Sequence, residues 1–309
     1  MRKFLLGTTA LVSAAVVASS AYADGHGSVK LTAFQRIYLE SIDEDFTNTA
    51  TVDRDQDYYF VTGGSNSELH WTFTKESDDG MTYGARFDTR WGGNSTDEVY
   101  LFFRGNWGTI HLGNDDDVTT NMVPGGENVL TGRFGYDGAH NNNVSAREVA
   151  EGVNLLALNA PDPIGGDGDN TKVAYYSPKS GGFQLGVSFE PGNDTTIASA
   201  SSARSNNYNS IFALAATYEG SAGGLSYSFG GGYIGADNDS NNHEDLEFYQ
   251  IGGTLSSGGI TLALGYGDNG DSGLTKTDTV GATAATTDGD AGDYYNIGLS
   301  YNYGAGSIA

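Results

Sequence analysis

The feature that most constrains this chain is a period-two alternation of apolar and polar side chains, which recurs along much of its length. It is clearest at 81–91, where Met81, Tyr83 and Phe87 alternate with polar residues such as Arg86. Successive side chains of a β-strand point to opposite faces, so this pattern predicts strands with one apolar and one charged face. We expect about twelve strands of this kind from the number of such stretches.

The connections between these stretches also alternate. Short glycine-bearing turns, such as 76–80 and 220–224, are followed by longer loops, such as 92–97 and 235–244. An up-and-down sheet with short turns at one end and long loops at the other is the layout of outer-membrane barrels. The sequence therefore predicts an all-β fold, a transmembrane antiparallel up-and-down β-barrel.

The first 23 residues have the pattern of a signal peptide. Arg2 and Lys3 precede an apolar stretch from Phe4 to Ala18, and Ala21-Tyr22-Ala23 supplies a small-x-small cleavage site. A transmembrane anchor is the alternative interpretation of this segment. If the segment is a signal peptide, the barrel domain comprises residues 24–309 and the protein is exported.

The composition excludes several classes of function. The chain has 39 Asp and Glu residues against 15 Lys and Arg, a formal charge of −24, and no cysteine. We expect no nucleic-acid partner, because such a protein needs a basic face. Disulfides, thiolate catalysis and Cys-ligated zinc are excluded. The sequence has neither a Gly-x-Ser-x-Gly elbow nor a His-Glu-x-x-His pair, so we do not expect an enzyme.

Three runs of residues resemble a known family. The run from Asn170 to Phe189 resembles a porin hairpin, Trp107 to Asn114 resembles the strand before the constriction loop, and Tyr295 to Gly306 resembles a late hairpin. The chain is thus similar to the α-proteobacterial, Rhodobacter-like branch of the Gram-negative general diffusion porins. The resemblance implies a homotrimer of sixteen-stranded, water-filled channels in the lipid of the outer membrane. It also implies passive diffusion of ions and small hydrophilic solutes without a cofactor.

The C-terminal end departs from the pattern of these porins. They end in a strand that closes with an aromatic residue, whereas this chain stops at Gly306-Ser307-Ile308-Ala309. About 12–13 strands cannot close a sixteen-stranded barrel, and an open edge in lipid leaves backbone groups unsatisfied. We therefore expect a sequence that is incomplete at its C-terminus, and a smaller barrel is the alternative.

The connection 114–170 is expected to fold inward as a constriction loop. It is far longer than the usual limit of about 12–15 residues for a structureless loop, and the resembling porins tuck a loop into the lumen at this point. Acids on the loop facing bases on the wall would set a transverse field, with a weak preference for cations. A solvated surface loop is the alternative. The expected acids are Asp115, Asp116, Asp117, Glu127 and Asp137, and the expected wall bases are Lys30, Arg36, Arg86, Arg90 and Arg104.

The predicted register has consequences for two adjacent residues. Phe87 should face lipid, so that Phe87→Arg impairs folding, and Arg86 should face water, so that Arg86→Phe is tolerated.

Two other functions stay open. An outer-membrane enzyme or adhesin barrel is one, and a soluble secreted calcium-binding β protein is the other. Several acidic loop runs have oxygen ligands that Ca²⁺ could use as a structural ion. These runs lack the full spacing of a calcium loop, so we interpret them as solvated loop tips. The weak candidates are Asp237, Asp239, Asp268 and Asp271.

Overall fold

The structure is a computed structural model that describes residues 27–35, 38–42, 56–61, 67–90, 96–129, 170–192, 208–238, 244–272, 293–304 and 306–308. The predicted signal peptide lies outside the described residues, as does the connection from 130 to 169. The same is true of three residues singled out from the sequence, Arg36, Asp137 and Asp239.

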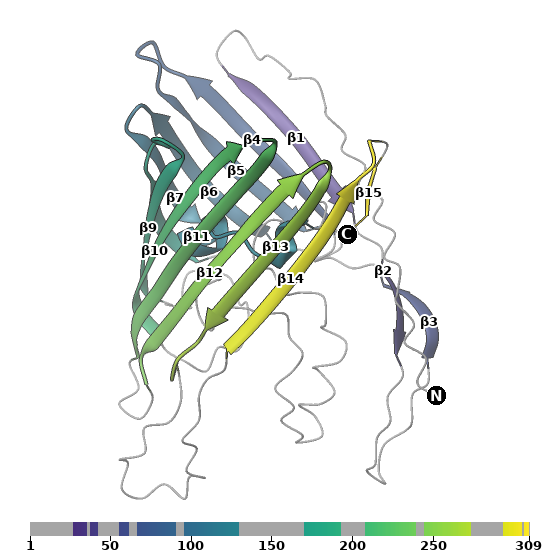
Figure 1. The fold of residues 1–309 in the computed structure, drawn as a ribbon. Helices are drawn as coiled ribbons and strands as arrows, with labels where there is room; N and C mark the ends of the chain where they lie inside the picture. Colours follow the sequence, from purple (N-terminus) through teal and green to yellow (C-terminus); the bar gives the residue numbers. More distant parts are fainter. Residues whose placement is uncertain are drawn as a thin grey trace, which may run out of the picture.

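Within the described residues, thirteen strands form one antiparallel sheet in which spatial neighbours follow the order of the chain (Figure 1). The up-and-down arrangement predicted from the sequence is confirmed. The strands are β1 (Ser28–Gln35), β4 (Ser67–Glu76), β5 (Thr82–Arg90), β6 (Thr96–Gly105), β7 (Gly108–Asn114), β8 (Thr171–Tyr176), β9 (Phe183–Gly192), β10 (Tyr208–Ala222), β11 (Leu225–Asn238), β12 (Leu246–Ser257), β13 (Ile260–Asp268), β14 (Asp293–Asn302) and β15 (Ser307–Ile308). A separate two-stranded sheet pairs β2 (Tyr38–Ile42) with β3 (Gln56–Val61).

Short glycine turns fix the register of the longest hairpins. Gly223 and Gly224 join β10 to β11 with φ angles of 59° and 83°, and Gly258 and Gly259 join β12 to β13 with 58° and 84°. Positive φ at both central residues matches the twist of the flanking strands, and glycine adopts it without a steric cost. The turn sequence therefore decides where each hairpin reverses, and hence which residues lie opposite each other.

This register separates the side chains of the sheet into two faces. Trp71, Phe87 and Val99 are direct cross-strand neighbours on the outer face, where the side chain of Phe87 is 40% exposed. On the opposite face, which we call the lumenal face, Arg86 lies between Thr72 and Tyr100. An apolar outer face and a polar inner face are the pattern of a transmembrane barrel. The period-two prediction is thus confirmed.

The segment after β7 packs against the lumenal face of the sheet. It contains a short helix, α1 (Val118–Met122), and a 3₁₀ turn, η2 (Gly126–Val129), and Figure 1 shows both within the curve of the sheet. Val118 and Val123 are buried with apolar residues of β8, β10, β11 and β12. The buried core therefore lies between this segment and the wall. Neither helical element in the described part of the chain has the length and hydropathy needed to cross a membrane.

Candidate functional site on the lumenal face

The lumenal face has two chemically different halves. From β1 to β7 it carries charged and polar side chains, with Lys30, Thr72, Arg86 and Tyr100 as successive cross-strand neighbours. From β8 to β14 small residues predominate, and α1 and η2 cover them. These small residues include Ala174, Gly186, Ala213, Ala215, Gly230, Gly232, Gly252, Ala263 and Gly298.

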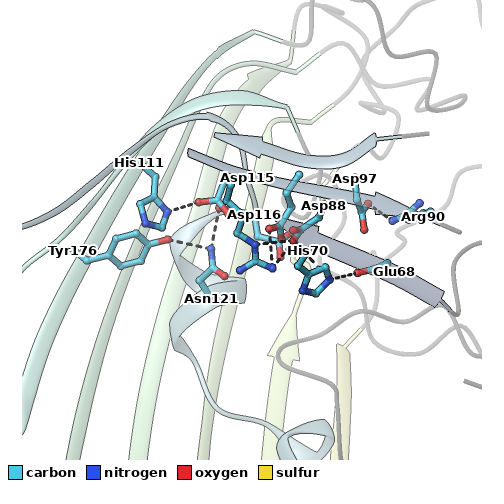
Figure 2. A network of polar contacts seen from close by, with 12 residues as sticks. Glu68, His70, Asp88, Arg90, Asp97, His111, Asp115, Asp116, Asn121 and Tyr176 are labelled. Carbon is cyan, nitrogen blue, oxygen red and sulfur yellow. Dashed lines mark hydrogen bonds and ion pairs between the residues drawn. The ribbon is translucent and has the colours of Figure 1, made fainter. Parts of the chain in front are cut away.

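Arg86 is the centre of an ion-pair network on β4, β5 and β6. Figure 2 shows this part of the wall, with Asp88, His70 and Arg90 among the labelled residues. Its Nε donates to Asp88 Oδ2 at 2.7 Å, its Nη2 contacts the same oxygen, and its Nη2 lies 3.5 Å from Glu98 Oε2. The side chain of Asp88 is 2% exposed, whereas that of Arg86 is 32% exposed. Arg86 therefore compensates a buried carboxylate while it still reaches water.

This pairing changes the expectation for Arg86→Phe. The register is as predicted, but Arg86 has more than solvent as a partner. A phenylalanine at this position would leave Asp88 buried without its cation, which costs free energy of folding. We therefore correct the prediction of tolerance to one of destabilisation.

The network continues toward the end of the sheet from which the long connections leave. His70 Nε2 lies 2.9 Å from Glu68 Oε2 and 3.8 Å from Asp88 Oδ2, and Arg90 pairs with Asp97. The register between β5 and β6 shifts beside Asp88, so that β6 has one extra residue there. Such a bulge re-aims side chains locally. Here it lets two consecutive acids of β6 contact arginines of β5.

A second polar cluster connects the wall to the start of the inward segment (Figure 2). His111 Nδ1 lies 2.6 Å from Asp115 Oδ2, and the imidazole stacks on the ring of Tyr100 with 4.4 Å between centroids. Asn121 of α1 donates to the hydroxyl of Tyr176 at 3.0 Å. These contacts hold the first turn of the segment against β6, β7 and β8.

Asp117 has a local structural role. Its carboxylate caps α1, accepting hydrogen bonds from the backbone N–H groups of Thr119 at 2.6 Å and Thr120 at 3.2 Å. Burial raises the pKa of this carboxyl above its ordinary value, although the hydrogen bonds from Thr119 and Thr120 act in the opposite direction. A capping carboxylate of this kind stabilises the exposed N–H groups of a helix start.

Asp115 and Asp116 precede Asp117 in a triplet of consecutive aspartates, and both also have neighbours close by. Asp115 is 3% exposed and bound to His111, and its backbone oxygen accepts from Lys172 Nζ. The backbone oxygen of Asp116 accepts from Asn121 Nδ2 at 3.2 Å. The expected geometry, in which the whole triplet faces the arginines of the wall, therefore needs correction for Asp115 and Asp117, because their carboxylates are buried in local hydrogen bonds.

The remaining predicted wall residues lie apart from the network. Lys30 is exposed on β1, and Arg104 is exposed near the short-turn end of β6, where its guanidinium lies 4.5 Å from the centroid of the Phe102 ring. Glu127 lies in η2, but its side chain is outside the described part of the structure. The lumenal face thus brings Arg86 and Arg90 together and leaves Lys30 and Arg104 separate.

The main omission of the sequence analysis is the set of acids on the wall itself. The signal for them was present, because Asp88 follows Arg86 by two residues and so shares its face. The bulge in β6 had no such signal. The wall residues that the sequence analysis did not single out are Glu68, Asp88, Asp97, Glu98 and Lys172.

The calcium candidates are not brought together by the described structure. Asp237 and Asp271 are exposed, and Asp268 Oδ1 accepts from the backbone N–H of Gly270 at 2.8 Å in a local turn. Within the described residues, no group of three or more histidine or acidic side chains is arranged to hold a metal ion.

An apolar outer face, a charged lumenal face and an up-and-down meander together define a transmembrane β-barrel. A family profile described as Gram-negative porin matches residues 7–309 of this chain. The chain therefore belongs to the Gram-negative porin family, and it is a bacterial outer-membrane protein. A comparison with curated protein sequences finds no match.

Solved structures of outer-membrane proteins are similar to this chain at low sequence identity. The anion-selective porin from Comamonas acidovorans has 18% sequence identity and a TM-score of 0.51, over 90% of this chain and 75% of its own. A mutant of the Rh. blastica porin has 17% identity and a TM-score of 0.41, over 90% and 91%. A loop-deletion mutant of OmpT, an outer membrane protein of Vibrio cholerae, has 12% identity and a TM-score of 0.45, over 91% and 90%. The first of these likenesses shows the porin fold of the sheet.

Proposed function

We propose that this porin is a water-filled passive channel for ions and small hydrophilic solutes, without a catalytic group or a cofactor. The observation that carries the proposal is the charged half of the lumenal face between β1 and β7. Charged side chains on this scale require water or close partners, since burial of an unpaired charge is costly. The partial exposure of Arg86 and Arg90, at 32% and 37%, supports a wetted wall.

We also propose that the connection 114–170 narrows the channel. Its described part, 114–129, covers the small-residue half of the wall between β8 and β14. The charged half then forms the opposite side of the passage. A solute at this height would pass the guanidinium of Arg86 and the acids around it, and a cluster with both signs of charge orients dipolar molecules.

We propose a weak preference for cations. Within the wall network, acidic side chains outnumber arginines. The chain as a whole also has far more acidic than basic residues. Rings of carboxylates favour cations in a pore. The network comprises the acids Glu68, Asp88, Asp97 and Glu98, the arginines Arg86 and Arg90, and the histidine His70.

A homotrimer in outer-membrane lipid is the assembly we propose, on the strength of the family resemblance. Chemical cross-linking of the purified protein in detergent tests it. Bands up to three subunits support the trimer, and a single subunit band at saturating cross-linker contradicts it.

Conductance in a planar lipid bilayer tests the channel directly. We expect discrete conductance steps and, in a KCl gradient, a reversal potential of the sign for cations. Asp97→Asn should shift that potential toward anions, and Arg90→Gln should shift it further toward cations, because these residues pair on the wall. Glu247→Gln makes the same charge change as Asp97→Asn at an exposed position of β12, on the outer face, and should leave the potential unchanged.

Each result has a defined consequence. An absence of conductance steps from correctly folded protein would contradict the channel and favour a barrel with another role. Anion selectivity, as named for the Comamonas porin, would leave the channel intact and refute the cation preference.

A further inference from the structure

In the part of the chain that the structure describes, five glycines of the lumenal face lie directly beneath the segment 118–129. A Cβ atom added to any of them would come within 3.0 Å of this segment, closer than real Cβ atoms approach their neighbours. At Gly252 and Gly298 the obstructing atoms are backbone oxygens, which cannot rotate away. We name this group the glycine seat. It consists of Gly186 on β9, Gly230 and Gly232 on β11, Gly252 on β12 and Gly298 on β14.

Hydrogen bonds lie beside both ends of the seat. The backbone N–H of Gly126 donates to Asn296 Oδ1 at 2.7 Å, two residues before Gly298. The backbone N–H of Val118 lies 3.4 Å from Ser188 Oγ, two residues after Gly186. Positions two apart in a strand share a face. At these two places a seat glycine and a hydrogen-bonding side chain are therefore neighbours on the wall beneath the segment.

The backbone conformation of these strands does not require glycine at the seat. The φ angles of the five seat glycines lie outside the positive range that favours glycine, unlike those of the hairpin turns. Glycine inside a strand weakens the strand, and it commonly marks a close approach of another backbone. The close approach here is that of α1, Pro124 and η2. Gly231, on the outer face between two seat glycines, is the contrasting case, because its added Cβ would meet its nearest neighbours at 3.4 Å.

We propose that the glycine seat positions the inward segment of the channel, and so keeps the charged half of the lumen open. This inference rests on the proposed channel function. Residues 118–129 can lie flat on β9–β14 only while the five seat positions of the wall have no side chains. A methyl group in the seat would lift the segment away from the wall, toward the network around Arg86, and would change the width of the passage.

The first test compares two glycine-to-alanine variants in planar bilayers. Gly252→Ala places a methyl group against the backbone oxygen of Pro124, whereas Gly231→Ala makes the same change on the opposite face. We expect the single-channel conductance of Gly252→Ala to shift from that of the parent, with that of Gly231→Ala unchanged. Heat-modifiable migration on gels gives the folded fraction of each variant, so that conductance is compared between folded channels.

The second test measures the position of the segment without using conductance. Because the chain has no cysteine, an introduced pair has only one possible disulfide. In the double variant Thr119→Cys, Gly232→Cys, the new Cβ atom would lie 3.0 Å from that of residue 119, so a shift of about 0.5–1 Å allows a disulfide. The control pair Thr119→Cys, Gly231→Cys places the second thiol on the outer face. After mild oxidation, loss of free thiol is expected for the first pair alone.

The possible outcomes distinguish a failure of the glycine-seat proposal from a failure of the proposed channel function. Disulfide formation in the first pair only, with a conductance shift in Gly252→Ala only, supports the seat. A conducting parent whose first pair keeps its thiols overturns it, and so does a folded Gly252→Ala variant with parental conductance. A folded parent that does not conduct contradicts the proposed function, and the thiol measurement then still decides where the segment lies.

Discussion

Replacing Arg86 with methionine should destabilise the folded barrel by about 2 kcal/mol. Removal of one partner from a fully buried ion pair costs about 3–5 kcal/mol, because the remaining charge is left uncompensated, whereas exposed pairs contribute about 0.2–1 kcal/mol. The pair of Arg86 and Asp88 lies between these limits, since Asp88 is 2% exposed and Arg86 is 32% exposed. Methionine keeps most of the apolar volume of the arginine side chain, so the loss reports mainly on charge.

The assay is a urea titration of the refolded protein in detergent or lipid, followed by gel mobility, which gives the free energy of unfolding. A double-mutant cycle with Asp88→Asn isolates the pairwise interaction. Once Asp88 is neutral, Arg86→Met should cost clearly less than it does in the parent. The coupling energy should therefore favour the pair of Arg86 and Asp88.

Arg104→Met is the matched control on the neighbouring strand. Arg104 is exposed, its guanidinium contacts the face of Phe102, and within the described residues no ion pair of it is observed. The expected cost is that of a cation–π contact, about 0.5–1 kcal/mol. Equal losses for Arg86→Met and Arg104→Met, or additive effects in the cycle with Asp88→Asn, would refute the buried ion pair as the source of stability.

Three further predictions follow from the described contacts. Phe87→Arg places a charge on the outer face and should cost about 2–4 kcal/mol in lipid, whereas Phe87→Leu should fold normally; equal urea midpoints for the two variants would refute the register. Asp117→Ala should lose about 1 kcal/mol of helix capping, whereas Asp117→Asn should keep the cap. Burial raises the pKa of Asp117 in the folded state. The free energy of unfolding should therefore fall as the pH rises from the pKa of Asp117 in the unfolded chain to its pKa in the folded protein. Asp117→Asn should remove this pH dependence. Among the described residues, both amide atoms of Gln250 are buried without a hydrogen-bond partner, so Gln250→Leu should stabilise the barrel by about 1–2 kcal/mol. Gln184→Leu, which loses the 3.0 Å hydrogen bond to Ser177 O, should destabilise it, and the same direction in both variants would contradict the reasoning.

The strand pattern and the turns were predictable because they depend on residues close together in the chain. A period of two assigns each side chain to one of two faces, and Trp71, Phe87 and Val99 share the outer face as expected. The glycine pairs of the hairpins need positive φ, which is a property of the residue itself. From these two local rules the meander and its polarity follow without any long-range information.

The assignment of partners on the lumenal face was less predictable. The sequence indicated that Arg86 and Asp88 share a face, but it did not reveal the extra residue of β6 that brings Asp97 and Glu98 against β5. A bulge depends on how two strands fit together, and a one-residue change of register moves every later side chain to the other face. For this reason the network was anticipated only in part.

The sequence by itself determined that this chain forms amphipathic strands in a meander, with charges on one face and apolar residues on the other. Only the tertiary structure decided which charges meet, where the aspartates after β7 lie, and why certain glycines are on the wall. Gly126 and Asn296 are 170 residues apart, and Val118 and Ser188 are 70 apart. Local periodicity carries no information about such pairs, because their contact depends on the curvature of the whole sheet around the inward segment.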